Sequence, residues 1–330
     1  MSTPARTVAV ALAAAVLAGC GGGHEHPPPT HPATASAAPP APVRRARAGP
    51  PFPVGLRVLT LVDRSRNVTV GGTRGPRTLV TYVRYPASGP RAGGDIRGAP
   101  PERAGAPYPL VVFGHGFNVL PSLYARLLRA WASAGYVVAA PTFPLENADA
   151  PGGADESDLV NQPRDMSFVI SALTHRAGPL AGLVDSGRVA VAGHSDGGET
   201  ALAVAYDRYF RDPRVRAAMI LSGAKIPGVG GFTFPAPSPP LLAAQGTADT
   251  VNPPGFTHAF YDAAPAPKYL LLLLGAEHIP PYSDEQPQLG IVGRVTTAFL
   301  DLYLKRDGQA ARRLGTAGDL AGVATLSANP

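Results

Sequence analysis

Short apolar runs alternate with stretches of helical periodicity along most of this chain, and this order constrains the fold more than any other feature. Pro109–Phe113, Tyr136–Ala140 and Arg188–Ala192 have the composition of strands that are buried on both faces of a sheet. Two alternating runs, Leu56–Val62 and Thr78–Tyr85, precede the first expected helix, so we expect the sheet to begin with antiparallel strands. Because parallel strands need a crossover connection, the alternation predicts an α/β fold with a mostly parallel central sheet and helices on both faces. The other expected strands cover residues 217–221, 241–244 and 269–274, and the expected helices cover residues 121–134, 163–174, 197–206, 255–263 and 291–305.

Composition divides the chain into regions. The chain has 330 residues, of which 45% are hydrophobic and 16% are charged, and this balance supports one large buried core in residues 53–305. Residues 21–52 are rich in Gly, Pro, Ala and Thr, which favours a disordered tether. Residues 306–330 are mostly small and polar, and we expect them to form a flexible C-terminal tail.

Residues 1–20 have the features of an export signal. A positive charge at Arg6 precedes an apolar run, Val8–Leu17, which is too short to span a membrane. The run is followed by Ala18, Gly19 and Cys20, and Cys20 is the only cysteine in the chain. The segment resembles the lipobox of bacterial lipoproteins, which implies an exported protein held at the outer face of the cell membrane by a lipid on Cys20. An ordinary cleaved signal with an incidental cysteine is the alternative.

The charge of the chain favours neither nucleic acid nor a metal ion as a ligand. The formal net charge is +6 and no basic cluster is interleaved with aromatic residues, so we expect weak attraction to anionic lipids and no nucleic-acid binding. His24, His26 and His31 could bind a metal loosely, but a solvated linker is the interpretation that we favour. We expect no cofactor, no metal site and a monomer.

The sharpest local signal is a G-x-S-x-G motif, Gly193-His194-Ser195-Asp196-Gly197, directly after an apolar run and directly before an expected helix. In that context the motif forms a tight turn that presents the serine hydroxyl at the edge of the sheet, and glycine avoids clashes with neighbouring backbone. Ser195 is therefore the candidate nucleophile. The alternative is a glycine-rich turn in which Ser195 only caps the helix.

A serine hydroxyl is a poor nucleophile at neutral pH and needs a general base. His258 and His278 are the only histidines after Ser195. His278 follows the last expected strand, where a loop reaches the carboxyl edge of the sheet, whereas His258 lies inside an expected helix. We therefore predict that His278 is the base, and the alternative is a surface histidine.

The base in turn needs a carboxylate that orients it. Asp249 follows the expected strand at residues 241–244, and it gives the chain order serine, acid, histidine that is typical of this kind of site. Asp262 lies in the next expected helix and is predicted to be solvated. Glu277 and Asp284 neighbour the base in sequence but do not fit that order, so Asp249 is the candidate acid.

A second oxyanion donor is expected in the loop Gly114-His115-Gly116-Phe117, which follows an earlier strand. The backbone N–H of Phe117 should form the oxyanion hole together with that of Asp196, and the Phe117 ring could line an acyl pocket. We interpret His115 as structural, holding the loop by a hydrogen bond, and His194 as packing under the catalytic imidazole. The Asp196 side chain is expected to turn away from the hole, because a carboxylate would repel the oxyanion.

Four strings in this order, V-F-G-H-G-F, G-H-S-D-G-G, Q-G-T-A-D and G-A-E-H-I-P, resemble those of one group of enzymes. Over residues 53–305 the chain resembles the α/β-hydrolases grouped with dienelactone hydrolases, bacterial polyester hydrolases and platelet-activating-factor acetylhydrolases. The resemblance implies hydrolysis of carboxylic esters through an acyl-enzyme, without a cofactor. The elbow has Asp where the polyester hydrolases commonly have Met or Gln, and their disulfide is absent, which argues against a polymer substrate. The site residues implied are Ser195, Asp249 and His278 as the triad, and Phe117 and Asp196 as oxyanion donors.

The function that we expect is therefore a serine hydrolase acting on a small-molecule or lipid ester. Two other functions stay open at this point: a non-catalytic lipoprotein that binds a lipid or cell-wall ligand, and a peptidase or thioesterase with the same triad. An acidic stretch, residues 145–163, is expected near the site, and we interpret it as plain surface rather than a lid. Its acidic residues are Glu146, Asp149, Asp155, Glu156 and Asp158.

Overall fold

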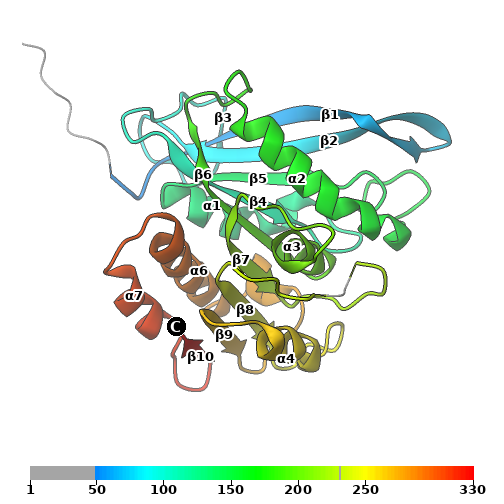
Figure 1. Cartoon of the computed structure of the whole chain (residues 1–330). Helices are drawn as coiled ribbons and strands as arrows, with labels where there is room; N and C mark the ends of the chain where they lie inside the picture. The colour runs from blue at the N-terminus through cyan, green and yellow to red at the C-terminus, as the bar shows by residue number, and fades with distance from the viewer. Residues whose placement is uncertain (1–48, 230–231) are drawn as a thin grey trace, which may run out of the picture. The chain divides into compact units, whose positions relative to one another are not determined.

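One ten-stranded sheet runs through the residues that this computed structural model describes, 49–229 and 232–330 (Figure 1). The strand order is β10-β9-β8-β7-β6-β4-β5-β2-β1-β3. The six strands from β9 to β5 in that order pair in parallel, whereas β10 pairs with β9, β2 with β5, and β1 with β2 in antiparallel fashion. The predicted α/β class, the mostly parallel sheet and its antiparallel start are confirmed.

The bounds of the elements agree closely with the sequence pattern in the centre of the sheet and differ at its edges. The strands are β1 (Val54–Val70), β2 (Thr73–Pro86), β3 (Ile96–Arg97), β4 (Tyr108–Gly114), β5 (Val137–Thr142), β6 (Val184–His194), β7 (Val215–Leu221), β8 (Leu241–Gly246), β9 (Lys268–Leu273) and β10 (Ala324–Asn329). The helices are α1 (Ala125–Ser133), α2 (Gln162–Thr174), α3 (Asp196–Tyr206), α4 (Pro254–Ala263), α5 (Pro280–Ser283), α6 (Gln288–Leu304) and α7 (Ala310–Ala317), with 3-10 turns η1 (Pro121–Tyr124) and η2 (Glu156–Asn161).

Helices cover both faces of the sheet because the central strands are apolar on both faces. Along β4, Val111 and Phe113 pack in the core shared with α1 and α6, whereas Leu110 and Val112 pack in the core shared with α2, α3 and α4. Successive side chains of a strand point to opposite faces, so one short apolar run builds both cores. Figure 1 shows the two helical layers on either side of the strands.

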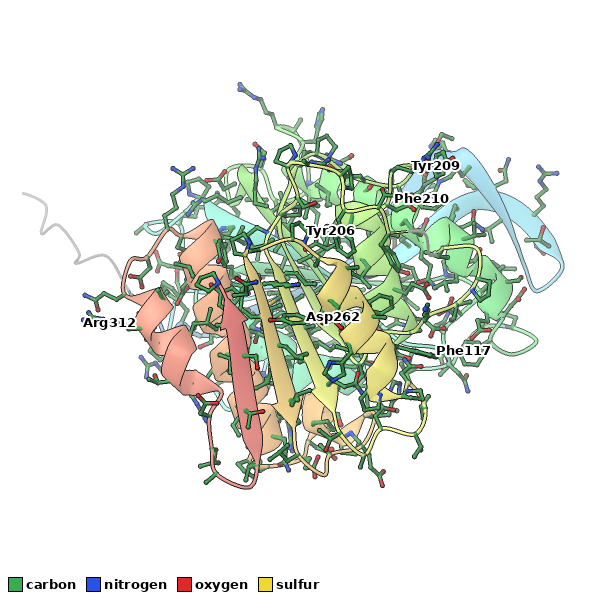
Figure 2. All side chains as sticks on the ribbon, turned by 60° about the horizontal axis from the view of Figure 1, so that its bottom comes forward. Phe117, Tyr206, Tyr209, Phe210, Asp262 and Arg312 are labelled. Carbon is green, nitrogen blue, oxygen red and sulfur yellow. The ribbon has the colours of Figure 1, made fainter. Side chains whose placement is uncertain are left out.

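The C-terminal segment differs from its prediction as a flexible tail. Residues 306–330 contain α7 and β10, and β10 pairs along its length with β9 at the open edge of the sheet. Leu314 of α7 is buried in the core, and Arg312 on the other side of the helix points into solvent (Figure 2). The prediction was wrong because an unpaired strand edge can order a polar segment through backbone hydrogen bonds that leave no hydrophobic period.

The N-terminal predictions lie outside the described residues. No helix within residues 49–229 and 232–330 has both the length and the apolar character needed to cross a bilayer. The predictions outside are the export signal at residues 1–20, the lipid site at Cys20, most of the tether at residues 21–52, and His24, His26 and His31.

Candidate active site

Ser195 occupies a strained turn between β6 and α3. Its backbone φ is 56° and its ψ is −123°, a combination that residues with a side chain rarely adopt. The flanking glycines permit this turn: a Cβ on Gly193 would lie 1.9 Å from the carbonyl oxygen of Gly197, and a Cβ on Gly197 would lie 2.2 Å from that of Gly114. The predicted strand-turn-helix context of the motif is therefore present, and it places Ser195 at the carboxyl edge of the sheet.

The three residues predicted as a triad meet at this edge from three separate loops. His278 Nε2 lies 3.0 Å from Ser195 Oγ, and His278 Nδ1 lies 2.8 Å from Asp249 Oδ2. When Nδ1–H donates to the carboxylate, Nε2 is free to accept the hydroxyl proton of Ser195. The geometry is the one required for an imidazole to act as a general base on Ser195.

Neutral donors hold the Asp249 carboxylate in its charged form. Its Oδ1 accepts hydrogen bonds from the backbone N–H groups of Val251 at 3.0 Å and Asn252 at 2.8 Å, and its Oδ2 also accepts from Gln245 Nε2 at 3.1 Å. Burial alone would raise the pKa of Asp249, but hydrogen bonds from His278 and Asn252 outweigh it and lower the pKa. Asp249 is thus an ionised group next to His278, as an orienting carboxylate must be.

His194 packs beneath His278, as predicted. The two ring centroids are 4.5 Å apart, His194 Nε2–H donates to the His278 carbonyl at 2.9 Å, and the Tyr124 hydroxyl lies 2.8 Å from His194 Nδ1. Burial, with a smaller contribution from the charge of His278, lowers the pKa of His194 to about 3. His194 therefore stays neutral and fixes the position of the His278 backbone.

His115 is structural, as predicted. Its Nε2 accepts a hydrogen bond from the Phe143 N–H at 3.0 Å, and its Nδ1 lies 2.8 Å from the Gly116 carbonyl oxygen. Burial lowers the pKa of His115 to about 4, so the ring is neutral. The ring ties the loop after β4 to the loop after β5.

The loop after β4 lies directly against the nucleophile. A Cβ on Gly116 would lie 3.0 Å from Ser195 Cβ, and the Asn118 N–H is already used by the Glu146 carbonyl at 2.9 Å. Within the described part of the chain, the N–H groups of Phe117 and Asp196 donate to no protein acceptor. These are the two groups predicted to form an oxyanion hole, and the structure leaves both unoccupied beside Ser195.

The Asp196 side chain contradicts its prediction. It does not turn away: Asp196 Oδ1 lies 3.4 Å from Ser195 Oγ, and the residue is 4% exposed. Its carboxyl group is hydrogen bonded to that of Glu146. The prediction assumed a free carboxylate, which would repel an oxyanion, and missed a neighbouring acid that shares a proton with it.

The acidic stretch at residues 145–163 is only partly the plain surface that we predicted. Glu146 and Asp158 are buried, and Asp158 forms an ion pair with Arg77 of β2. The exposed members are Asp149, Asp155 and Glu156. Two of the five acidic residues therefore belong to the core beneath the site.

Sequence reasoning missed Asn252. Its Nδ2 donates to Ser195 Oγ at 3.3 Å and to the Ser222 carbonyl at 2.8 Å, so one amide links the nucleophile to the end of β7. An asparagine three residues after Asp249 matches no motif that could have identified it. The rejected candidates lie elsewhere: Asp262 on α4 (Figure 2), Glu277 and Asp284 are exposed, and His258 is half-buried on α4.

Similarity to known proteins falls on the same region. A family model described as chlorophyllase matches residues 89–221, which include Phe117 and Ser195 and end before Asp249. Chlorophyllase-2 from Arabidopsis thaliana is 23% identical over 242 residues, covering 61% of this chain and 74% of that protein. The structure of a ferulic acid esterase from Streptomyces cinnamoneus is similar with a TM-score of 0.61 at 24% identity, covering 81% of this chain and 93% of that chain. Together with the sheet order and the serine elbow, these likenesses identify the chain as a member of the α/β-hydrolase superfamily.

Proposed function

We propose that the protein is a serine esterase that cleaves carboxylic esters through an acyl-enzyme on Ser195. One observation carries the proposal: an unbroken hydrogen-bond chain runs from Ser195 Oγ through His278 to Asp249, with links of 3.0 Å and 2.8 Å. The names of the similar proteins, which include a ferulic acid esterase, support an ester as the substrate.

In the acylation step, His278 Nε2 accepts the hydroxyl proton while Ser195 Oγ attacks the ester carbonyl. Asp249 stabilises the imidazolium that forms. The N–H groups of Phe117 and Asp196 hold the oxyanion, and a donor of this kind contributes roughly 3–4 kcal/mol to the transition state.

Deacylation uses the same groups in the reverse order. His278 gives its proton to the leaving alcohol, then accepts a proton from water as that water attacks the acyl-enzyme. Collapse of the second tetrahedral intermediate releases the acid and returns the proton to Ser195. No group beyond the chain's own residues is needed for either step.

Two exposed apolar side chains flank the triad and indicate what the substrate meets there. Phe117 is 41% exposed (Figure 2), and Val251, whose N–H holds Asp249, is 63% exposed. Two cavities of about 780 Å³ and 440 Å³ lie elsewhere and include none of the triad. We infer an open site that takes a small-molecule or lipid ester with an apolar group on either side of Ser195.

The decisive test compares the wild-type protein, residues 49–330, with its Ser195→Ala variant on p-nitrophenyl esters of increasing acyl length. The variant should be slower by at least about 10⁴-fold, as expected when the nucleophile of a triad is removed. Equal rates would refute the proposal. A matched panel of thioesters and amides separates an esterase from a thioesterase or a peptidase.

A non-catalytic binding protein is the second candidate, and the intact Ser195-His278-Asp249 chain argues against it. A fluorophosphonate reports the difference directly, since it labels an activated serine and leaves an ordinary one unmodified. Labelling of Ser195 that disappears in His278→Ala would exclude the binding protein.

Membrane attachment through a lipid on Cys20 is a further part of the proposal and rests on the sequence alone. The full chain, expressed in a bacterium with radiolabelled fatty acid, should carry label and partition into detergent. Cys20→Ala should lose both properties. Label retained by Cys20→Ala would contradict an anchor at this residue.

A further inference from the structure

Two carboxyl groups that touch beside Ser195 have no cation between them. Glu146 and Asp196 are hydrogen bonded to each other, and they are 0% and 4% exposed. Asp196 Oδ2 and Glu146 Oε1 have no donor among the described residues, and Gln162 Nε2 donates to the other Glu146 oxygen, Oε2. Two ionised carboxylates cannot hydrogen bond to each other, so at least one proton must lie between these oxygens.

The surroundings of this pair favour a retained proton. Burial raises the pKa of Glu146 to about 10, and Asp196 raises it further, as do Asp158 and Glu156 of η2. Burial also raises the pKa of Asp196 to about 6, against the hydrogen bond from Glu146.

The charged groups that face Asp196 come from three other elements. Glu156 of η2 disfavours its ionisation, and His278 from the loop after β9 favours it. Asp196 in turn raises the pKa of Glu199 one turn along α3, and that of Tyr124 in η1. Between about pH 6 and about pH 10 the pair therefore holds one proton and one negative charge.

The pair also connects the two halves of the expected oxyanion hole. Asp196 contributes one N–H and its Oδ1 lies 3.4 Å from Ser195 Oγ. Glu146 holds the other half through its backbone, because its carbonyl accepts the N–H of Asn118, next to Phe117. A change in the protonation of this pair is thus felt where the oxyanion develops.

We propose that Glu146 is a positioning residue that keeps a shared proton against Asp196 and so limits the negative charge beside the oxyanion. The inference rests on the proposed esterase function and adds a regulating feature to the same site. A single charge spread over two hydrogen-bonded carboxyl groups repels an oxyanion less than a bare carboxylate at Asp196. Loss of the last proton leaves two charges there and should slow acylation.

Two variants of the same residue should move the pH profile in opposite directions. Glu146→Gln keeps a donor to Asp196 and an acceptor for Gln162 but has no proton to lose. Its kcat on p-nitrophenyl butyrate at about pH 8 should stay within about threefold of wild type, and the alkaline fall of the wild type near pH 10 should be absent. Glu146→Leu leaves Asp196 to hold the proton alone, so the fall should move to lower pH. Both variants should change kcat and leave KM in place.

Glu199→Gln is the matched control, because it removes another buried acid of α3 that contacts the Ile226 N–H and not the pair. It should keep the wild-type alkaline limb. One shared limb in wild type, Glu146→Gln and Glu146→Leu would overturn the proposal, and so would an equal loss of kcat in the two Glu146 variants.

An infrared measurement separates this proposal from the proposed function and needs no turnover. The difference spectrum of wild type minus Glu146→Gln at about pH 9 should contain the C=O stretch of a protonated carboxyl group. Its absence would overturn the shared proton even in an active enzyme. A wild-type protein that neither cleaves esters nor reacts with a fluorophosphonate would instead end the esterase proposal and leave the infrared test standing.

Discussion

The molecule buries carboxyl groups in two neighbouring regions and neutralises them in different ways. The first region, which we call the hairpin anchor, joins the β1–β2 hairpin to η2 and α2 through arginines. The second, the elbow acids, surrounds the turn at Ser195 and uses protons and neutral donors. The hairpin anchor comprises Asp63, Arg66, Arg77, Asp158 and Asp165, and the elbow acids are Glu146, Asp196 and Glu199.

In the hairpin anchor, one guanidinium holds two carboxylates in bidentate geometry. Arg77 donates to both oxygens of Asp165 and both oxygens of Asp158 over 2.6–2.9 Å. Burial opposes its charge, but the hydrogen bonds from Asp165 and Asp158 outweigh burial and raise the pKa of Arg77. Its charge is fixed at every physiological pH, so the anchor holds the hairpin and reports nothing about protons.

The elbow acids have no such partner within the described residues, and their charge depends on pH. Glu199 accepts from the Ile226 N–H at 2.7 Å and leaves its other oxygen without a donor. Burial raises the pKa of Glu199 to about 8. The comparison teaches that arginine is used where the fold must be held, and a titratable proton where negative charge lies next to the chemistry.

Removing the cation of the hairpin anchor should have the largest effect. Arg77→Met leaves Asp158 buried without its cation and Asp165 with Arg66 alone, which should lower the free energy of unfolding by about 3–5 kcal/mol. Urea unfolding at neutral pH measures this loss, and Arg74→Met, exposed on the same strand, is the control. Similar unfolding free energies for the two variants would contradict the role of the anchor.

The elbow acids should behave in the opposite way when one of them is neutralised. The pKa of Glu199 is raised in the folded protein, so the folded state holds a proton that the unfolded chain loses near its ordinary pKa of 4.5. Stability from this group is therefore complete below about pH 4.5 and falls as the pH rises toward 8. Glu199→Gln should gain on the order of 2 kcal/mol over wild type between these limits. Melting temperatures at pH 5 and pH 8 test the sign, and a gap that shrinks with pH would show it to be wrong.

The contrast explains how far the sequence could be interpreted. Ser195 and His278 could be predicted because the elbow motif and the chain order depend on residues next to each other or next to a strand. Asp249 followed from the same logic. The central strands and helices were predicted because their apolar periods are determined locally.

The elbow acids could not be predicted in the same way. A sequence records that Glu146 is acidic, but only the fold shows that it is buried and hydrogen bonded to Asp196. The error for Asp196 came from assigning it a full charge, whereas the neighbour that shares its proton lies 50 positions away in the sequence. Asn252 was missed for a related reason, because an amide donor is recognised by what it contacts.

Asn252 gives a smaller effect and tests whether neutral donors suffice for the third buried carboxylate, Asp249. Asn252→Ala keeps the backbone N–H that holds Asp249 and removes the side-chain donor to Ser195 Oγ and the Ser222 carbonyl. We expect kcat to fall about five- to tenfold, or about 1 kcal/mol, with KM nearly unchanged. Val251→Ala, which keeps its own backbone bond to Asp249, should alter KM rather than kcat. A normal kcat in Asn252→Ala would mean that the side-chain contact does not position the nucleophile.

The smallest effect is expected at the far end of the elbow network, and it separates support of the fold from control of the proton. Thr200 Oγ1 donates to Gln162 Oε1 at 2.9 Å, and the Gln162 amide in turn donates to Glu146. Thr200→Val has nearly the same shape and removes only this hydroxyl, so it should cost about 1 kcal/mol of stability through the buried amide oxygen left without a donor. Gln162 still donates to Glu146, so the alkaline limb of kcat should stay where it is, and Thr200→Ser should restore the stability. A limb that moved in Thr200→Val would show that the proton beside Ser195 is controlled by the whole network, and the division between a region that holds the fold and a region that holds a proton would then have to be drawn differently.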